Sequence, residues 1–449
     1  MKFKIRRGLN LKLEGEAEKI TTVQEQIDTV RISPSDFHPY TPKLLVQAGE
    51  EVKAGTPLLY FKEHPSVKVC SPVSGEVVEI ERGEKRRLLG IKILADKAIT
   101  YQKFEPFDYR NADRAALIQR LCDMGLWPFF RQRPFDVVAN PLQVPKAIVV
   151  SAFDTAPLAP DMDFIVHGNG PDFQAGLDIL ARLTPGKVYL NVHDVRTRSD
   201  IFLNARQVTV HTFSGPHPAS NPGVQIHHID PINKGEVVWT LSVPDVLCLG
   251  KSVMENQFVA SRVIALTGSE MLRRRYVKTV IGASLKPLLA GNITHPDSTR
   301  IISGNVLTGT HVGMDGHLGY YHSQVTAIPE VQEPEFLGWI APGFSKFSIN
   351  HSYFSWLRPG KKYILNSGLQ GEKRAFVVTG EYEKVFPMDI YPVQLVKAIL
   401  ANDLEQMESL GAYEVAPEDF ALCEFVCTSK IPVQKIVREG LDLLMRETA

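Results

Sequence analysis

The sequence predicts an α+β protein with several domains, and three patterns support this prediction. Short stretches of alternating apolar and polar residues, separated by glycine and proline, fill residues 28–100 and are typical of strands. Strand-like and helix-like stretches alternate over 105–250, and from Pro387 the apolar residues recur with the helical period. At roughly 100–200 residues per domain, the 449 residues correspond to two to four domains.

The composition narrows the class of protein. Hydrophobic residues make up 44% of the chain, which is enough for real cores, and Lys+Arg and Asp+Glu both number 50. A net charge of zero gives no global attraction to nucleic acid or anionic lipid. No apolar run approaches the roughly 18 residues of a transmembrane helix, and the start lacks a signal-peptide core. The five scattered cysteines fit reduced thiols, so we expect a cytoplasmic protein.

The first domain is predicted to span residues 1–104. Within it, "AGEEVKAGTPL" followed by "SPVSGEVVEI" resembles the two halves of a biotinyl/lipoyl-type domain, also called a barrel-sandwich hybrid. Lys62 lies ten residues before Pro72, close to where such domains carry their modified lysine. The flanking "LYFKEHPSVKV" lacks the Met-Lys-Met that is typical of biotin carriers. We therefore predict a structural use of this fold.

Residues 105–254 are predicted to form a Rossmann-like α/β domain. Helical spacing marks "AALIQRLCDMGLW" and "DFQAGLDILARL", and Asp172 stands near the start of the second helix. Four apolar stretches are predicted strands: "KAIVVSAF", "FIVHG", "KVYLNVH" and "QVTVHTF". Strands that alternate with helices favour a mostly parallel sheet with both faces covered.

The remainder divides into a strand-rich part, 255–385, and a helical part, 386–449. The expected strands lie in "SRVIALTG", "RYVKTVIGAS", "TRIISGNVLTG", "KFSINHSYF" and "RAFVVTGEY". The helical period runs through "PMDIYPVQLVKAILANDLEQMESLG" and "PVQKIVREGLDLLMRE". Asn402 or Asp403 and Gly411 are typical of helix ends.

Local motifs provide no complete catalytic constellation, so we predict no cofactor and no metal bound by this chain. The loop "HGNGPDF" lacks the third glycine of a dinucleotide fingerprint, and no Walker A motif is present. The histidines of one region have no zinc-ligand spacing; they are His193, His211, His217, His227 and His228. Cys423 and Cys427 supply too few thiolates for an iron–sulfur cluster. The carboxylates of Asp154, Asp161 and Asp163 could bind Mg²⁺, but turn chemistry explains them better.

Several motifs in register nevertheless resemble one family over nearly the whole chain. They are "LLVQAGEEVKAGTPLLYFK", "SPVSGEVVEIERGEKR", "GLWPFFRQRPFD", "VSAFDTAPLAPD", "FSGPHPASNPGVQIHHIDP", "RIISGNVLTG" and "PEDFALCEFVCTSK". In this order they are similar to the NqrA family, which belongs to the sodium-translocating NADH:quinone oxidoreductase.

This resemblance implies a place in a six-subunit bacterial membrane complex, NqrA to NqrF, that carries electrons from NADH to quinone and expels Na⁺. The partner subunits would hold FAD, FMN, riboflavin and the iron–sulfur centres, with quinone as substrate. The NqrA subunit would be peripheral, on the cytoplasmic face of the inner membrane, in contact with the membrane subunit NqrB. The resemblance also implies an SLBB-type β-grasp domain within 255–385, and degenerate flavin-type and iron–sulfur-type domains at 105–254 and 386–449. Whether the quinone is ubiquinone or menaquinone stays open.

The stretch "GLWPFFRQRPFD" is the candidate site, and its prolines and glycine predict an irregular surface loop. Aromatic faces can stack on a quinone, and an arginine can hydrogen-bond its carbonyl. One hypothesis is that the segment lines a quinone-facing or partner-facing surface through Trp127, Phe129, Phe130, Arg131 and Arg133. The other is that these residues fill a vanished cofactor cavity. Three further alternatives are a pure scaffold, a carrier protein using Lys62 and a flavoprotein dehydrogenase.

Overall fold

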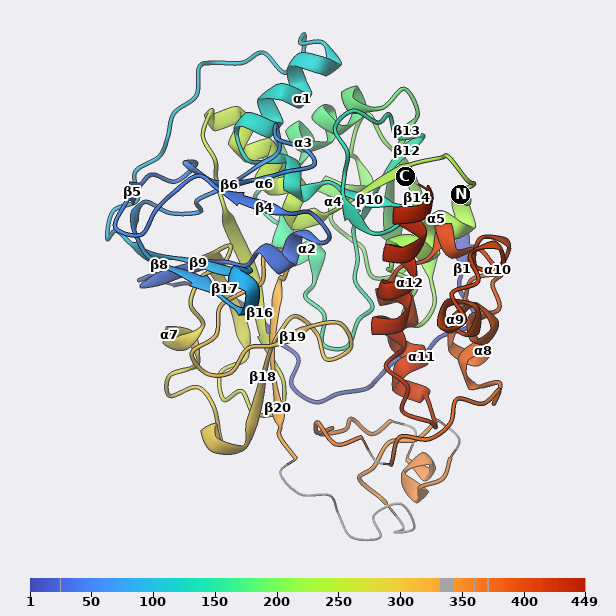
Figure 1. Cartoon of the computed structure of the whole chain (residues 1–449). Coiled ribbons are helices and arrows are strands. Elements are labelled where there is room, and N and C mark those ends of the chain that lie inside the picture. Colours follow the sequence, from blue (N-terminus) through green and yellow to red (C-terminus); the bar gives the residue numbers. More distant parts are fainter. Residues whose placement is uncertain (25, 332–342, 350, 359, 370, 449) are drawn as a thin grey trace.

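The computed structural model describes residues 1–449 except 25, 332–342, 350, 359, 370 and 449. Four sheets form within the described residues, with a cluster of helices close to both chain termini (Figure 1). None of the helices described is long and apolar enough to cross a membrane.

Two small antiparallel sheets account for the strands expected over residues 28–100. One has the order β3-β9-β8-β5, formed by Thr29–Ile32, Leu88–Ala95, Gly75–Arg82 and Glu51–Val52. The other has the order β4-β6-β7, formed by Pro42–Leu44, Pro57–Phe61 and Lys68–Cys70. Their inward side chains, among them Leu58, Val69 and Ile91, are buried, as the alternating sequence pattern predicts.

A seven-stranded sheet forms the centre of the α/β domain, in the order β1-β14-β13-β12-β15-β10-β11. Its strands are Lys2–Lys4, Thr209–Ser214, Lys187–His193, Ala147–Ser151, Val238–Ser242, Arg131–Arg133 and Val137–Val138. The first five in this order pair in parallel, which confirms the predicted parallel sheet, whereas β10 runs antiparallel to both of its neighbours.

Helices α3 (Gly170–Leu183) and α6 (Val243–Glu255) pack tightly on each other beside this sheet. A Cβ atom on Gly250 would lie 1.9 Å from the backbone oxygen of Asp172, so only glycine permits this approach. The other helices of the region are α1 (Arg114–Asp123), α2 (Met162–Val166), α4 (Asp200–Leu203) and α5 (Pro222–Ile229).

The prediction of a strand at "FIVHG" is wrong, because these residues belong largely to α2. The side chain of Asp161 accepts hydrogen bonds from the backbone amides of Asp163 and Phe164 and so caps a helix there. A short apolar run fits a buried helix and a buried strand equally well, and the cap decides between them.

A six-stranded sheet follows, in the order β19-β18-β20-β16-β17-β2. Its strands are Thr310–His311, Thr299–Ser303, Gln324–Pro329, Ser261–Thr267, Arg275–Val280 and Glu18–Val23. The short helix α7 (Lys286–Leu289) lies between β17 and β18 in the chain. The N-terminal segment therefore supplies β1 to the α/β sheet and β2 to this sheet, so it ties together parts of the chain beyond its own predicted domain. The domain boundaries themselves stay predictions.

The expected strands at "KFSINHSYF" and "RAFVVTGEY" are absent from the described residues of 346–354 and 374–382. A single 3-10 helix, Phe354–Leu357, occupies the end of the first stretch. Its neighbours Tyr353 and Tyr363 are buried, and Tyr363 bridges to the backbone of Leu13 instead of extending a sheet. In the first stretch Phe347 packs beside Leu11 and Leu13, and in the second Phe376 packs against the core of the C-terminal helices. The sequence pattern does not distinguish such packed irregular segments from strands.

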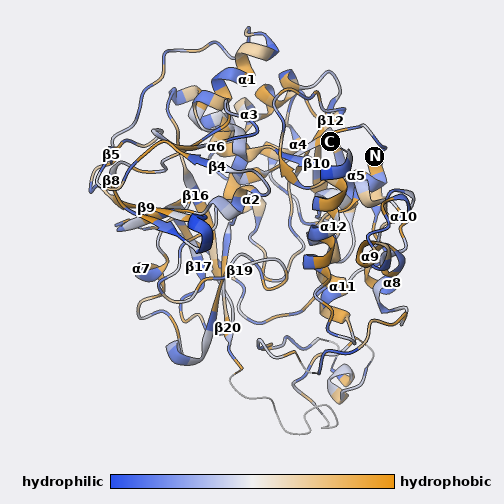
Figure 2. Cartoon of the chain, in the orientation of Figure 1, coloured by the Kyte–Doolittle hydropathy of each residue, from blue (hydrophilic) through white to orange (hydrophobic). Residues whose placement is uncertain are grey.

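The C-terminal part is helical, as predicted. Its helices are α8 (Glu381–Val385), α9 (Pro392–Leu400), α10 (Leu404–Ser409), α11 (Ala421–Val426) and α12 (Val433–Thr448). Asp403 caps α10 by accepting a hydrogen bond from the amide of Gln406, and Gly411 has the positive φ typical of a helix end. Apolar and polar residues interleave along α12 in Figure 2, and its buried face packs in one core with Ile5 and Phe213 of the α/β domain.

Candidate functional site: an arginine–carboxylate junction between domains

The candidate segment does not form an exposed loop. After a 3-10 helix, Trp127–Phe129, the chain enters β10, which is hydrogen-bonded to β15 on one side and β11 on the other. The expectation of an irregular surface loop is therefore wrong. Pro134 stands just past the end of β10, where a missing amide costs no hydrogen bond of the strand ladder.

The three aromatic side chains are completely buried. Trp127 stacks on Phe130 with a ring-centroid distance of 4.8 Å, and Trp239 meets both rings edge-on. The indole nitrogen of Trp127 donates to the backbone oxygen of Ala139 over 2.7 Å. Phe129 packs on the other side, against Tyr320 at 5.5 Å. The rings therefore form a continuous buried layer between the sheet and the domain that follows it.

Arg133 points into the C-terminal helical part, and only 2% of its side chain is exposed. One guanidinium nitrogen lies 2.9 Å from Oδ2 of Asp419, and another lies 2.6 Å from Oε1 of Glu418. Asp419 has no exposed side-chain surface, and its Oδ2 also accepts from the amide of Ala416. Both charges are therefore buried, paired and hydrogen-bonded, which is the condition under which a protein tolerates them.

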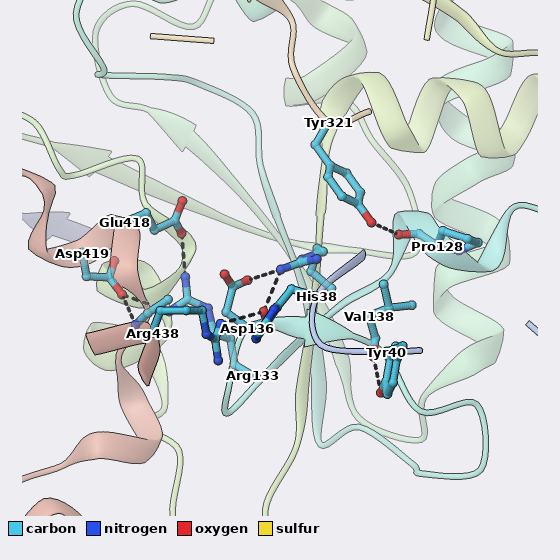
Figure 3. A network of polar contacts seen from close by, with 12 residues as sticks. His38, Tyr40, Pro128, Arg133, Asp136, Val138, Tyr321, Glu418, Asp419 and Arg438 are labelled. Carbon is cyan, nitrogen blue, oxygen red and sulfur yellow. Dashed lines mark hydrogen bonds and ion pairs between the residues drawn. The ribbon is translucent and has the colours of Figure 1, made fainter. Parts of the chain in front are cut away.

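Arg131 points differently and keeps 20% of its side chain exposed. Its guanidinium lies 3.1 Å from Oδ1 of Asp136 and stands over the ring of Tyr321, 5.2 Å from the ring centroid. The Tyr321 hydroxyl donates to the backbone oxygen of Pro128 over 2.7 Å (Figure 3). This arginine therefore joins the candidate segment to the domain that follows β16.

Groups from the first domain and from α12 complete the junction (Figure 3). Tyr40 donates from its hydroxyl to the backbone oxygen of Val138 over 2.9 Å. His38 lies 2.8 Å from the carboxylate of Asp442, and this carboxylate also forms an ion pair with the Nε of Arg438. We call the set of Arg131, Arg133, Asp136, Glu418, Asp419, Arg438 and Asp442 the arginine–carboxylate junction. Four parts of the chain meet there, each through at least one directed polar contact.

Burial and ion pairing have opposite effects on the acids of the junction. Burial raises the pKa of Glu418 to about 7, although the charge of Arg133 acts against this shift. Burial alone would raise the pKa of Asp136, but the nearby guanidinium groups of Arg131, Arg133 and Arg438 hold this pKa below its usual range. Each arginine of the junction already faces a carboxylate. The geometry of the junction is therefore suited to fixing domain positions.

A second buried ion pair was not anticipated from the sequence. Arg262 of β16 lies 2.6 Å from Asp245 of α6, and its side chain is fully buried beneath the face of Phe129. Its Nε and Nη1 have no hydrogen-bond partner within the described structure, and neither has the Tyr320 hydroxyl. The available signal was an arginine inside the apolar strand "SRVIALTG", since a charge at such a position needs a buried partner.

The remaining sequence candidates have ordinary structural roles. Lys62 begins the exposed turn between β6 and β7, and its amide donates to Thr41. Burial raises the pKa of the Cys423 thiol, and the sulfur of Cys427 accepts from the hydroxyl of Tyr382. Asp163 accepts from two backbone amides of a neighbouring loop.

Within the part of the chain that the structure describes, no group of three or more His, Cys, Asp or Glu could hold a metal ion. The histidines of the cluster serve separate contacts: His227 pairs with Glu414, and His217 contacts Thr155.

Comparison with known proteins agrees with this architecture. Family models match three stretches: the NqrA N-terminal barrel-sandwich hybrid domain at residues 3–96, the NqrA second alpha/beta domain at 112–258, and the NQRA C-terminal (SLBB) domain at 263–313. These matches confirm the predicted fold classes of the three domains.

The chain also matches curated proteins along its whole length. It is 36% identical over 446 residues to the NqrA subunit of the Na(+)-translocating NADH-quinone reductase from Vibrio parahaemolyticus, covering 99% of both chains. The same subunit of Saccharophagus degradans is 37% identical, with 99% of this chain and 100% of the relative covered. A NAD⁺-reducing [NiFe]-hydrogenase structure aligns over 78% of this chain and 72% of its own at 11% identity. Its TM-score of 0.39 is too low to support a conclusion about this chain.

Replacing Arg133 by methionine is expected to lower the free energy of unfolding by about 3–5 kcal/mol, because it leaves Asp419 charged and buried without a partner. Urea unfolding measures the change. The matched control Arg446→Met, at an exposed position of α12, should stay within about 0.5 kcal/mol of the parent. A loss below about 1 kcal/mol for Arg133→Met would contradict this role.

Stability should also fall as the pH is lowered, through His217. Burial lowers the pKa of His217 to about 4, while the unfolded chain binds a proton at about pH 6.5. Between these values the unfolded state binds more protons, so this residue removes up to about 3 kcal/mol as the pH falls from 6.5 to 4. The His217→Asn variant should show a shallower decline in urea midpoint over this range. An unchanged slope would show that His217 is not responsible.

Proposed function

The chain belongs to the NqrA family of the Na⁺-translocating NADH-quinone reductase, and from this premise we propose that it takes part in binding the quinone. The oxidoreductase activity is that of a multi-subunit complex, and this chain is one of its subunits. The observation that supports the proposal is the match to the relative over 99% of both chains, which leaves no domain of the relative without a counterpart in this chain.

The division of labour in the complex is part of this proposal. The partner subunits would carry FAD, FMN, riboflavin, the iron–sulfur centres and the Na⁺ path, and the membrane subunit NqrB would be the main contact of this chain. The buried, engaged state of Cys423 and Cys427 supports placing the clusters elsewhere. The proposed location is the cytoplasmic face of the inner membrane, as a peripheral subunit.

The proposed role of the candidate segment is narrower than the sequence suggested. Trp127, Phe129 and Phe130 would be the apolar wall of a quinone site that opens between the α/β domain and the domain containing Arg262. Two features support this choice. The guanidinium of Arg262 and the hydroxyl of Tyr320 have donors without partners beside Phe129, and a quinone carbonyl accepts such hydrogen bonds.

Arg131 would stand at the entrance of this site. It is the arginine of the candidate segment with a partly exposed side chain, and it covers Tyr321, the neighbour of Tyr320. Arg133, in contrast, would hold the site in place without touching the quinone, because Asp419 and Glu418 occupy its guanidinium.

A scaffold that only holds partner subunits together is the second candidate. Complete burial of the three rings favours it, since a filled cavity offers a ligand no surface. The two functions differ in one observable, the specific binding of quinone to this chain.

The Arg131→Gln variant should bind quinone about tenfold to a hundredfold more weakly within the assembled complex, since a charge-assisted hydrogen bond contributes about 1.5–3 kcal/mol. A photoreactive quinone analogue, competed by excess natural quinone, should label peptides within 124–136 and 320–324 of the parent chain. Labelling of these peptides should fall in the variant.

The matched control is Lys146→Gln, which removes a cation of similar exposure, 19%, at another position next to the same sheet. It should leave quinone labelling unchanged. Competable labelling confined to the partner subunits would contradict quinone binding by this chain and leave the scaffold function.

A further inference from the structure

Residues 343–349, 351–358 and 360–364, which we call the aromatic–basic tip, differ from the rest of the described surface. The chain as a whole is neutral, yet this stretch contains Lys346, Arg358, Lys361 and Lys362 and no acidic residue. It also contains nine aromatic or large aliphatic residues: Phe344, Phe347, Ile349, Tyr353, Phe354, Trp356, Leu357, Tyr363 and Ile364. Figure 1 shows it in orange at the end of the molecule opposite α1.

The large apolar side chains of the tip face solvent. Phe344, Phe354, Trp356, Leu357 and Ile364 are 48–58% exposed. Among the described residues, every phenylalanine and tryptophan with a largely exposed side chain lies in this stretch. Single exposed aliphatic residues are common on protein surfaces, but a concentration of rings indicates a surface with a partner.

The exposure is not that of a loosely packed coil. Tyr353 and Tyr363 are buried, and Phe347 packs on Tyr363 with a ring-centroid distance of 5.4 Å. Tyr363 further bridges to Leu13, so the inner side of the tip is anchored to the body of the protein. The fold therefore buries one set of aromatic residues and presents another set outward.

The outward rings and the cations lie together. The rings of Phe344 and Phe354 pack together with their centroids 5.8 Å apart. The ammonium group of Lys361 donates a hydrogen bond to the backbone oxygen of Phe344 over 2.9 Å. Trp356 and Leu357 share a single 3-10 helical turn with Phe354, and Arg358 follows this turn directly and is exposed. Of the cations, Lys362 lies 3.1 Å from Glu16 and is half exposed.

We propose that the aromatic–basic tip binds the surface of an anionic lipid bilayer. Tryptophan and phenylalanine insert into the headgroup region, and lysine and arginine attract anionic lipids from the same side. The stretch from 343 to 364 has four cations and no acidic residue, and the neighbouring Glu16 is paired with Lys362. This excess of cations fits an anionic lipid surface better than a protein surface of mixed charge. The proposal adds a direct membrane contact to the contacts through partner subunits, and it does not depend on quinone binding.

Vesicle sedimentation of the full chain tests the proposal, with quinone-free vesicles of phosphatidylcholine alone or mixed equally with phosphatidylglycerol. The chain should sediment with the anionic vesicles and be released by high salt. Phe354→Ser/Trp356→Ser and Arg358→Glu/Lys362→Glu should each weaken binding by about tenfold or more. The control pair Leu142→Ser/Val144→Ser, which removes side chains 84% and 52% exposed elsewhere, should bind as the parent does.

Fluorescence provides a second readout that is independent of folding defects. The difference between the parent spectrum and that of Trp356→Phe isolates Trp356, and this difference should shift to shorter wavelength on anionic vesicles. Equal binding to neutral vesicles, or binding that survives both tip variants, would overturn the proposal. So would absent vesicle binding together with failure of the ring variant to co-purify with the membrane complex, because the tip would then contact a protein.

Discussion

The ion pairs that Arg133 forms with Asp419 and Glu418 are the contact on which the arrangement of the domains depends. They connect β10, inside the α/β sheet, with the helical turn that precedes α11. Desolvating these charges costs free energy that their mutual attraction offsets only in a well-defined geometry. The helical part therefore docks in one orientation, although much of the adhesion comes from the shared core that contains Phe213, Val396 and Leu441.

That constraint determines what the aromatic residues next to Arg133 can do. With Arg133 directed toward α11 and Arg131 directed toward Tyr321, the intervening backbone is held in β10, and the preceding rings fill the space beside Trp239. The candidate segment is thus part of a packed core in this structure. Access for a planar ligand would require the domain with Arg262 to move relative to the sheet, and the partnerless donors of Arg262 lie at that interface.

The sequence predicted those features that arise from local chemistry. Glycine and proline spacing located the small sheets, and the helical period located α9, α10 and α12, with Asp403 and Gly411 at the two ends of α10. It did not predict β10, because Pro128 and Pro134 mask a strand of three residues. It also could not identify the role of Arg133, since Asp419 is 286 residues away and no local pattern records such a pairing. The aromatic residues were compatible with a surface and a core alike, and only tertiary packing decides between them.

The N-terminal segment adds to the same constraint from the other direction. β1 pairs with β14 and β2 pairs with β17, so the first residues of the chain connect the α/β sheet to the six-stranded sheet. Together with the arginine–carboxylate junction, these strands make the described parts of the chain depend on one another, which a row of independent domains would not do.

Native-state hydrogen exchange of the full chain tests this interdependence most directly. If the junction couples the helical part to the sheet, the amides of β10 and those of α11 and α12 should open with the same free energy, as one cooperative unit. Helices α11 and α12 that exchange through a separate opening of much lower free energy, while β10 stays protected, would contradict the account.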